Sequence, residues 1–231
     1  MRFIIIGCAY AGKTTLAVEI SKWMIREHGR PFARWHNHFI APHLERHLVV
    51  NRGAADRFDV VREETPDRDP DAMVAQFRSM APAMLESFSR HMIWHHLHPS
   101  MFHDDPDCLF IDFYYGDAVY APLYYGYGEP GSFADRDRRA RAWDGHVAQL
   151  APDTVLVLVR ASASVIRERM RLAPRPESFL QDGHVERVLA EFERQYANAL
   201  IPRRIAVDTS SGCANAAFDS FLSQMAPHLP A

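Results

Sequence analysis

The sequence lacks several features that would assign it to common classes of protein. No apolar run approaches the roughly 20 residues that a membrane-spanning helix requires. The three cysteines, Cys8, Cys108 and Cys213, are widely separated and form no C-x-x-C pair, so neither a disulfide framework nor a cysteine zinc site is indicated. The formal net charge of −3 argues against a nucleic-acid partner. An apolar strand pattern begins after two residues and leaves no room for a signal peptide, so we expect a cytoplasmic protein without membrane or nucleic-acid partners.

Internal repeats and low-complexity segments are absent as well. The chain has 231 residues, of which 48% are hydrophobic and 24% are charged, and this is enough to bury one sizeable core. We therefore expect a single domain over residues 1–231.

What the sequence does contain is a glycine-bounded loop near its start. Residues 7–14, GCAYAGKT, fit the pattern G-x-x-x-x-G-K-[ST] and follow residues 3–6, FIII, which have the pattern of a buried strand. The residues after the loop place four apolar side chains on one helix face: Leu16, Ile20, Trp23 and Met24. Gly7 and Gly12 allow a tight turn whose backbone N–H groups point inward, and the helix adds its positive dipole end. The segment therefore predicts a phosphate-binding loop.

Two side chains of this loop predict what it binds, which we expect to be ATP and Mg2+. Lys13 would bridge the β- and γ-phosphates, and Thr14 would offer its hydroxyl to the metal ion. We expect the nucleotide to contact eight residues of the loop and the first helical turn: Gly7, Ala9, Tyr10, Ala11, Gly12, Lys13, Thr14 and Thr15.

Strand and helix patterns alternate along the rest of the chain. Apolar runs predict strands at residues 31–36, 107–112, 154–160 and 204–208. Apolar residues at steps of three and four predict helices at residues 69–98, bent at Pro82, and at 134–150, 162–172, 184–200 and 214–225. Buried strands joined through helices indicate three α/β/α layers around a five-stranded parallel sheet, in an α/β protein. We interpret the polar residues 51–71 as a mobile connection.

The carboxyl ends of parallel strands are where ligands collect in such sheets. Asp112 ends one apolar run, and we expect this catalytic carboxylate to hold Mg2+ together with Thr14. Residues 113–127 then carry seven aromatic side chains, which we interpret as a loop that either stacks on a planar acceptor or packs in the core. Within this segment, Asp117 and Tyr120 are the residues that we expect to bind the acceptor.

Basic residues follow the strand predicted at 31–36. His36 and His38 are candidates to bind the small-molecule acceptor if that acceptor carries a phosphate. A hydroxyl acceptor would instead require a carboxylate base, for which Glu45 and Asp56 are candidates. The histidines also permit a zinc site, although a chain with 13 histidines produces such spacings by chance.

The strand predicted at 154–160 is followed by a helix rich in arginine: Arg167, Arg169, Arg171 and Arg175. Cations in these positions can offset the negative helix end, or they can close over a triphosphate as a mobile lid. We expect a lid at about residues 167–183. Arg167 and Arg171 are our candidates for catalysis because residues four apart share one helix face.

Several segments together resemble the thymidylate kinases and their deoxynucleoside kinase relatives among the P-loop kinases. They are GCAYAGKTT at the start, FIDFYYGDAVYAPLYYG and VLVLVRASASVIRERMR in the middle, and HVERVLAEFERQYANAL with RIAVDTSSG near the end. The resemblance implies a P-loop NTPase fold with an arginine-bearing lid, Asp112 beside the metal and Tyr120 near the acceptor base. It also implies that residues 209–212 form a turn beside adenine, which makes Ser210 a nucleotide contact.

The chain departs from this family on the acceptor side. Phe113 stands where the family has an arginine, and residues 36–38, HNH, replace a motif that carries glutamate. We therefore expect an ATP-dependent kinase that transfers the γ-phosphoryl group to a nucleoside monophosphate or a nucleoside-like acceptor. The alternative is a kinase of a non-nucleotide hydroxyl acceptor, such as a sugar or an antibiotic.

Two other classes fit the sequence less well. A regulatory nucleotide-hydrolysing P-loop protein that binds guanine would carry an Asn/Thr-Lys-x-Asp motif, which does not occur. A mechanical ATPase would carry an Asp-Glu pair after the strand at 107–112, and this is also missing. The apolar stripe of the helix predicted at 69–98 can pair two copies into a homodimer or can pack within the monomer.

Overall fold

The computed structural model describes residues 1–32, 34–37, 47–52, 58–63, 75–77, 79–104, 107–175 and 178–229. Its main sheet has the strand order β2-β5-β1-β6-β7, and every pairing in it is parallel. The strands are β1 (Arg2–Ile6), β2 (Arg34–Asn37), β5 (Cys108–Ile111), β6 (Val155–Arg160) and β7 (Arg203–Asp208). Because they are parallel, their carboxyl ends share one edge of the sheet.

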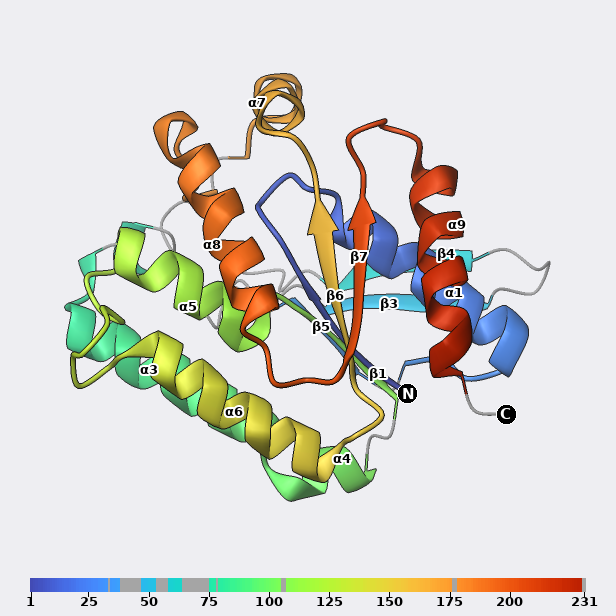
Figure 1. Cartoon of the computed structure of the whole chain (residues 1–231), viewed down its shortest axis with the longest axis horizontal. Coiled ribbons are helices and arrows are strands. Elements are labelled where there is room, and N and C mark those ends of the chain that lie inside the picture. The colour runs from blue at the N-terminus through green and yellow to red at the C-terminus, as the bar shows by residue number, and fades with distance from the viewer. Residues whose placement is uncertain are drawn as a thin grey trace.

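Helices cover both faces of this sheet (Figure 1). On one face lie α1 (Lys13–His28) and α9 (Ala214–Met225). The other face is covered by α5 (Phe113–Tyr124) and α8 (Val185–Ala197), with α3 (Pro82–His96) and α6 (Arg136–Leu150) outside α5. Shorter elements complete the described helices: α4 (Pro99–Asp104), α7 (Ala163–Leu172), and the 3₁₀ turns Asp182–His184 and Ala226–His228. The α/β fold with a parallel sheet is therefore confirmed.

The centre of the core is β1, whose five residues are all buried between the two helical layers. This explains why its apolar run is unbroken: a strand with neighbours on both sides and helices on both faces has no solvent-facing position. The chain leaves β1 at Ile6, directly into the glycine-bounded loop.

The interpretation of residues 113–127 as an aromatic loop is wrong, because most of this segment is helix α5. Tyr114 and Tyr115 are fully buried, so the alternative of core packing is confirmed for them. Both hydroxyls donate to one carboxylate oxygen of Asp144, at 2.8 and 2.5 Å. Buried tyrosines can lie on a helix that faces the core when their polar ends find such a partner.

The helix predicted over residues 69–98 is also wrong in its extent. Helix α3 begins at Pro82, and Ala81 before it is extended, with φ −63° and ψ 142°. Proline disfavours helical geometry in the residue that precedes it and suits the first position of a helix, so it starts α3 rather than bending it. Residues 75–77 and 79 are helical, whereas 69–74 and 78 lie outside the described residues.

Part of the polar run at 51–71 is regular structure rather than a connection. Strands β3 (His47–Arg52) and β4 (Phe58–Glu63) form an antiparallel pair in which Val49 faces Val61 and Val50 faces Val60. Residues 53–57 and 64–71 lie outside the described residues.

In the part of the chain that the structure describes, no helix combines the length and the apolar character needed to cross a bilayer.

Candidate functional site

The loop between β1 and α1 turns at two glycines with positive φ. Gly7 has φ 149° and Gly12 has φ 94°, both in the region that favours glycine. A Cβ on Gly7 would lie 2.4 Å from the Val159 carbonyl oxygen, so no other residue fits without a backbone shift. The loop lies at the sheet edge where β6 and β7 also end (Figure 1). The predicted strand, loop and helix are therefore present in that order.

The ammonium group of Lys13 lies inside this loop. Its Nζ donates to the carbonyl oxygens of Gly7 at 2.6 Å and Cys8 at 3.0 Å. It also lies 3.2 Å from Oδ2 of Asp112, at the end of β5. The structure thus brings together the lysine and the carboxylate that the sequence predicted, from segments about 100 residues apart.

The backbone at Asp112 is strained. Asp112 has φ 64° and the next residue, Phe113, has φ 47°, so two consecutive non-glycine residues are left-handed. Each such residue costs about 1–2 kcal/mol. The backbone N–H of Asp112 donates to the Ile5 carbonyl at 2.8 Å, which ties the strained turn to the neighbouring strand. Strain of this kind is commonly found at functional sites.

The Asp112 carboxylate is suited to a cation. Burial raises its pKa to about 6, against the opposing effect of Lys13. Its Oδ1 is buried and makes no hydrogen bond to any described residue. The half-buried Thr14 lies in the adjacent first turn of α1, with Thr15 exposed beside it. A carboxylate oxygen without a partner and a threonine hydroxyl are the donors that Mg2+ prefers, so these residues fit the ion.

Other residues of the loop are held by distant parts of the chain. The N–H of Ala9 donates to the Tyr120 hydroxyl at 2.9 Å, so Tyr120 contacts the loop itself. The carbonyl of Ala11 accepts a hydrogen bond from the Thr209 hydroxyl at 2.7 Å. Thr209 directly follows β7, and the loop is therefore connected to the turn at residues 209–212.

The two arginines named as catalytic do not contact this loop. Arg167 pairs with Asp182 and Glu186, and Arg171 pairs with Glu168 on the same helix. Arg171 is exposed and Arg167 is half-buried. Their catalytic role stays a prediction.

Arg169 is the helix residue that reaches the loop. It donates to the Tyr10 carbonyl at 3.0 Å and to the Thr209 carbonyl at 2.7 Å. The sequence carried a signal for this: Arg169 is three residues after Ile166, the fully buried residue of α7, and therefore faces the protein body. Arg167 and Arg171 lie on the opposite side of the helix.

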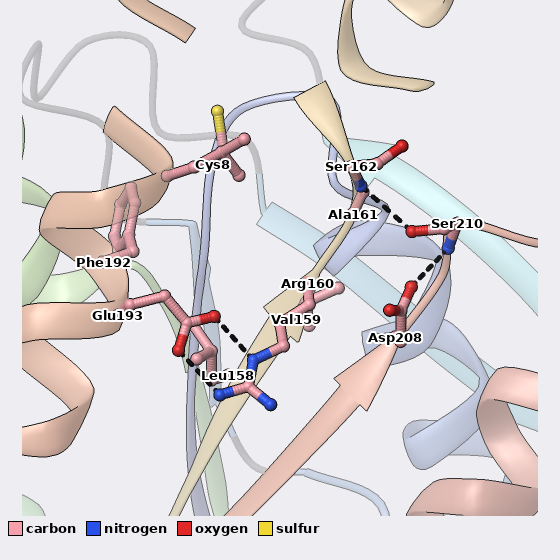
Figure 2. A pocket seen from close by; sticks show the side chains of 11 residues that line it. Cys8, Leu158, Val159, Arg160, Ala161, Ser162, Phe192, Glu193, Asp208 and Ser210 are labelled. Atoms are coloured by element: carbon pink, nitrogen blue, oxygen red, sulfur yellow. Dashed lines mark hydrogen bonds and ion pairs between the residues drawn. The ribbon is translucent and has the colours of Figure 1, made fainter. Parts of the chain in front are cut away.

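A cavity of about 240 Å³ lies beside the loop, between α8 and the ends of β6 and β7 (Figure 2). Cys8 of the loop and Phe192 of α8 contribute apolar lining, and Ser210 contributes a hydroxyl. The Ser210 Oγ accepts from the Ser162 N–H at 3.0 Å, and its own N–H donates to Asp208 at 2.7 Å. The predicted nucleotide contact Ser210 thus shares a cavity with the phosphate-binding loop.

Comparisons with known proteins agree with this geometry at the level of fold. No family model matches the chain, and no curated protein matches it. Among solved structures, a deoxyadenosine kinase from M. mycoides with dCMP and a flexible dCDP has a TM-score of 0.56 at 12% identity, over 98% of this chain and 100% of that one. The same kinase with dATP has a TM-score of 0.56 at 14% identity, again over 98% and 100%. The YorR protein from Bacillus subtilis, in complex with phosphorylated GDP, has a TM-score of 0.51 at 15% identity and full coverage of both chains.

The chain shares the fold of these solved structures. The side of the sheet edge where we expect the acceptor is described only in part. Asn37 of β2 pairs with Ile111 of β5, so the chain leaves β2 next to Asp112. His36 lies within β2, but its side chain and the whole of His38 are outside the described residues, as are Glu45 and Asp56. Their roles stay predictions.

Asp117, the remaining acceptor candidate, is buried on α5. Its Oδ1 accepts from the Tyr127 hydroxyl at 2.6 Å, and its Oδ2 accepts from the Arg136 Nε at 2.5 Å. Both oxygens therefore have protein partners, and a role in acceptor binding stays a prediction.

Proposed function

We propose that this protein is an ATP-dependent kinase that transfers the γ-phosphoryl group to a nucleoside monophosphate or a nucleoside-like acceptor. The observation that carries the proposal is the meeting of Lys13 and Asp112 at a glycine-bounded loop between a strand and a helix. A fixed cation at a helix start and a carboxylate that can hold a metal ion are what phosphoryl transfer requires.

The residues of the loop would act by rearranging their present contacts. Lys13 now donates to loop carbonyls, and an arriving triphosphate offers it stronger, charged acceptors. Arg169 keeps the loop connected to the end of β7 through Tyr10 and Thr209. Thr14 and Asp112 would hold Mg2+, which supplies charge neutralisation for the triphosphate when bound.

We place the donor adenine at residues 209–212, with Ser210 as one of its contacts. Support comes from the link between Thr209 and the phosphate-binding loop, because a nucleotide bound in the loop must extend toward a segment near it. Ser210 also lines the same cavity as Cys8, which belongs to the loop (Figure 2).

The acceptor assignment rests on chemistry and on the neighbours' ligands. The solved neighbours hold deoxynucleotides, which favours an acceptor of nucleoside type over a sugar or an antibiotic. The exit of β2 beside Asp112 is where such an acceptor would meet the γ-phosphate. His36 and His38 would bind its phosphate if it carries one.

Incubation with labelled ATP, Mg2+ and a panel of nucleosides, nucleoside monophosphates, sugars and aminoglycosides tests the proposal. We expect label to move to a nucleoside or its monophosphate and to stay on ATP when a chelator removes Mg2+. Transfer to a sugar or an aminoglycoside alone would establish the alternative acceptor class. Absence of ATP binding by calorimetry would reject the kinase function altogether.

We also propose a homodimer formed through α3. Its surface carries Met84, Phe88 and Trp94, which are 52%, 44% and 50% exposed. Apolar side chains of this size on one helix favour contact with another protein surface. Sedimentation should give a dimer for the native chain and a monomer for Phe88→Glu, and a monomeric native chain would contradict the proposal.

A further inference from the structure

Tyr10, in the phosphate-binding loop, contacts the arginine-rich segment in two ways. Its carbonyl accepts a hydrogen bond from Arg169 at 3.0 Å. Its side chain lies against Arg175: the hydroxyl accepts the Arg175 backbone N–H at 3.0 Å, and the guanidinium lies 4.9 Å from the ring centroid. One loop residue therefore contacts both α7, through Arg169, and the segment that follows α7, through Arg175.

The backbone of Tyr10 is unusual for a residue of its type. Its φ is 65°, a left-handed value that glycine adopts without strain and that tyrosine adopts only at a cost. A side chain retained at such a position has contacts that compensate the strain. The Tyr10 side chain is half-buried against the hydrophobic core, and its hydroxyl and ring also contact Arg175.

Arg175 differs from its neighbours in what holds its charge. Arg167 and Arg171 are each in bidentate contact with a glutamate, and Arg169 is in contact with carbonyl oxygens. The Arg175 guanidinium lies on an aromatic face and forms no ion pair with any described residue. A ring face attracts a cation less strongly than a carboxylate or a phosphate does. Arg175 can therefore move to a phosphate without breaking an ion pair.

We propose that Tyr10 is a positioning residue that holds Arg175 at the rim of the phosphate-binding loop, where its guanidinium contacts the γ-phosphate of the bound nucleotide. The proposal rests on the proposed function and deepens it by naming which arginine meets the transferring group. Tyr10 acts through Arg175, and its ring provides a waiting position for the guanidinium while the loop is empty.

Calorimetric titration with Mg-ATP and with Mg-ADP tests this, because the two ligands differ only in the γ-phosphate. We expect Arg175→Ala to reduce the preference for ATP over ADP by roughly tenfold or more, because a charged hydrogen bond to the γ-phosphate is lost. The affinity for ADP should stay unchanged. Tyr10→Gly accepts the same φ and removes the ring, so it should reduce the preference in the same direction. Tyr10→Phe keeps the ring face and should retain most of the preference.

The control is Arg204→Ala. Arg204 also lies over a tyrosine ring, that of Tyr196 at 5.8 Å, but on β7 away from the loop, and its loss should leave the preference unchanged. Native ADP affinity in Arg204→Ala shows that the loop is intact in the control. In the Tyr10 variants the ratio of ATP to ADP affinity separates loss of the γ-phosphate contact from a general loss of nucleotide binding.

Each outcome decides a different part of the inference. Equal loss of ATP and ADP affinity in Arg175→Ala would show that this guanidinium does not meet the γ-phosphate. A preference that survives Tyr10→Gly but not Arg175→Ala would remove Tyr10 from the inference. A native protein that binds neither ligand would overturn the proposed function and this inference together.

Discussion

Two buried charged clusters of this protein lie on neighbouring elements and differ in how completely their polar groups are paired. In the first, Arg136 has no exposed surface and bonds Asp117 at 2.5 Å and Glu86 at 3.1 Å. Its guanidinium also lies 4.9 Å from the Tyr127 ring centroid. Burial alone would lower the pKa of Arg136, but Asp117 and its neighbours raise this pKa above its ordinary value. Arg136 therefore keeps its positive charge although it is buried.

The second cluster, Lys13 with Asp112, is incomplete. One oxygen of Asp112 has no hydrogen bond to a described residue, and Lys13 is bonded to loop carbonyls rather than only to its carboxylate. The backbone at Asp112 is strained, whereas that at Asp117 is helical. Polar groups that are all hydrogen-bonded within the protein stabilise the folded state, whereas a buried polar group without a partner can form a hydrogen bond to a ligand. Variants in the two clusters should therefore fail in different ways.

Lys13→Ala should have the largest effect of the four variants, and this effect should be on the rate of phosphoryl transfer rather than on stability. We expect phosphoryl transfer to the acceptor found in the panel to fall by about 10³-fold or more, because a cation aimed at the transferring group is lost. Unfolding stability should change little, since a neutral Asp112 can remain buried. The control is Lys22→Ala on the same helix, where Lys22 pairs with Glu19 and should be dispensable. Native turnover in Lys13→Ala would reject the mechanism.

Arg136→Ala should instead reduce the stability of the protein. It leaves Asp117 and Glu86 buried without their cation, which costs about 3–5 kcal/mol of unfolding free energy. Urea denaturation measures this, with Arg171→Ala as the control for an exposed ion pair, which should change the stability far less. If Arg136→Ala and Lys13→Ala lose equal stability, the contrast between the clusters is wrong.

Gly7→Ala should lower both the stability of the protein and its affinity for the nucleotide. The new Cβ meets the Val159 carbonyl oxygen at 2.4 Å, so the loop or β6 must shift, at a cost of about 1–3 kcal/mol. Calorimetry should show weaker nucleotide binding as well. In Gly29→Ala, by comparison, φ is also positive at 63° but no atom lies within 4 Å, so binding should be unchanged. Native nucleotide affinity in Gly7→Ala would contradict the role of this close approach.

Ser162→Ala should have the smallest effect of the four variants, a slight loss of stability. The Ser162 hydroxyl accepts from the Val165 N–H at the start of α7, and loss of such a cap costs about 1 kcal/mol. Thermal unfolding of the variant and of the native protein would detect the change. An unchanged melting temperature would show that the cap contributes nothing.

The P-loop assembly could be predicted because its information is local. An apolar run, a glycine-bounded loop and an amphipathic helix follow one another within residues 2–28, and neighbours in sequence are neighbours in the structure there. Asp112 could be predicted for a related reason: parallel strands end at one sheet edge, so a carboxylate after β5 must lie near the loop after β1.

The parts that could not be predicted depend on which face of a helix is buried. Residues 113–127 have an aromatic composition that suits either a stacking loop or a buried helix, and only packing against α6 through Asp144 decides it. The same holds for the arginines of α7, since the buried face that contains Ile166 selects Arg169 for contact with the loop.

The order of residues alone was sufficient for the α/β fold with a parallel sheet, for the glycine-bounded loop between the first strand and helix, and for the proximity of Lys13 and Asp112. These follow from periodicity and from the shared direction of strands. The tertiary structure decided that Asp117 lies in a closed ion cluster, that Arg169 contacts the loop, and that Tyr10 contacts Arg175. These contacts join segments 19 to 165 residues apart, so they depend on which faces of the helices pack together.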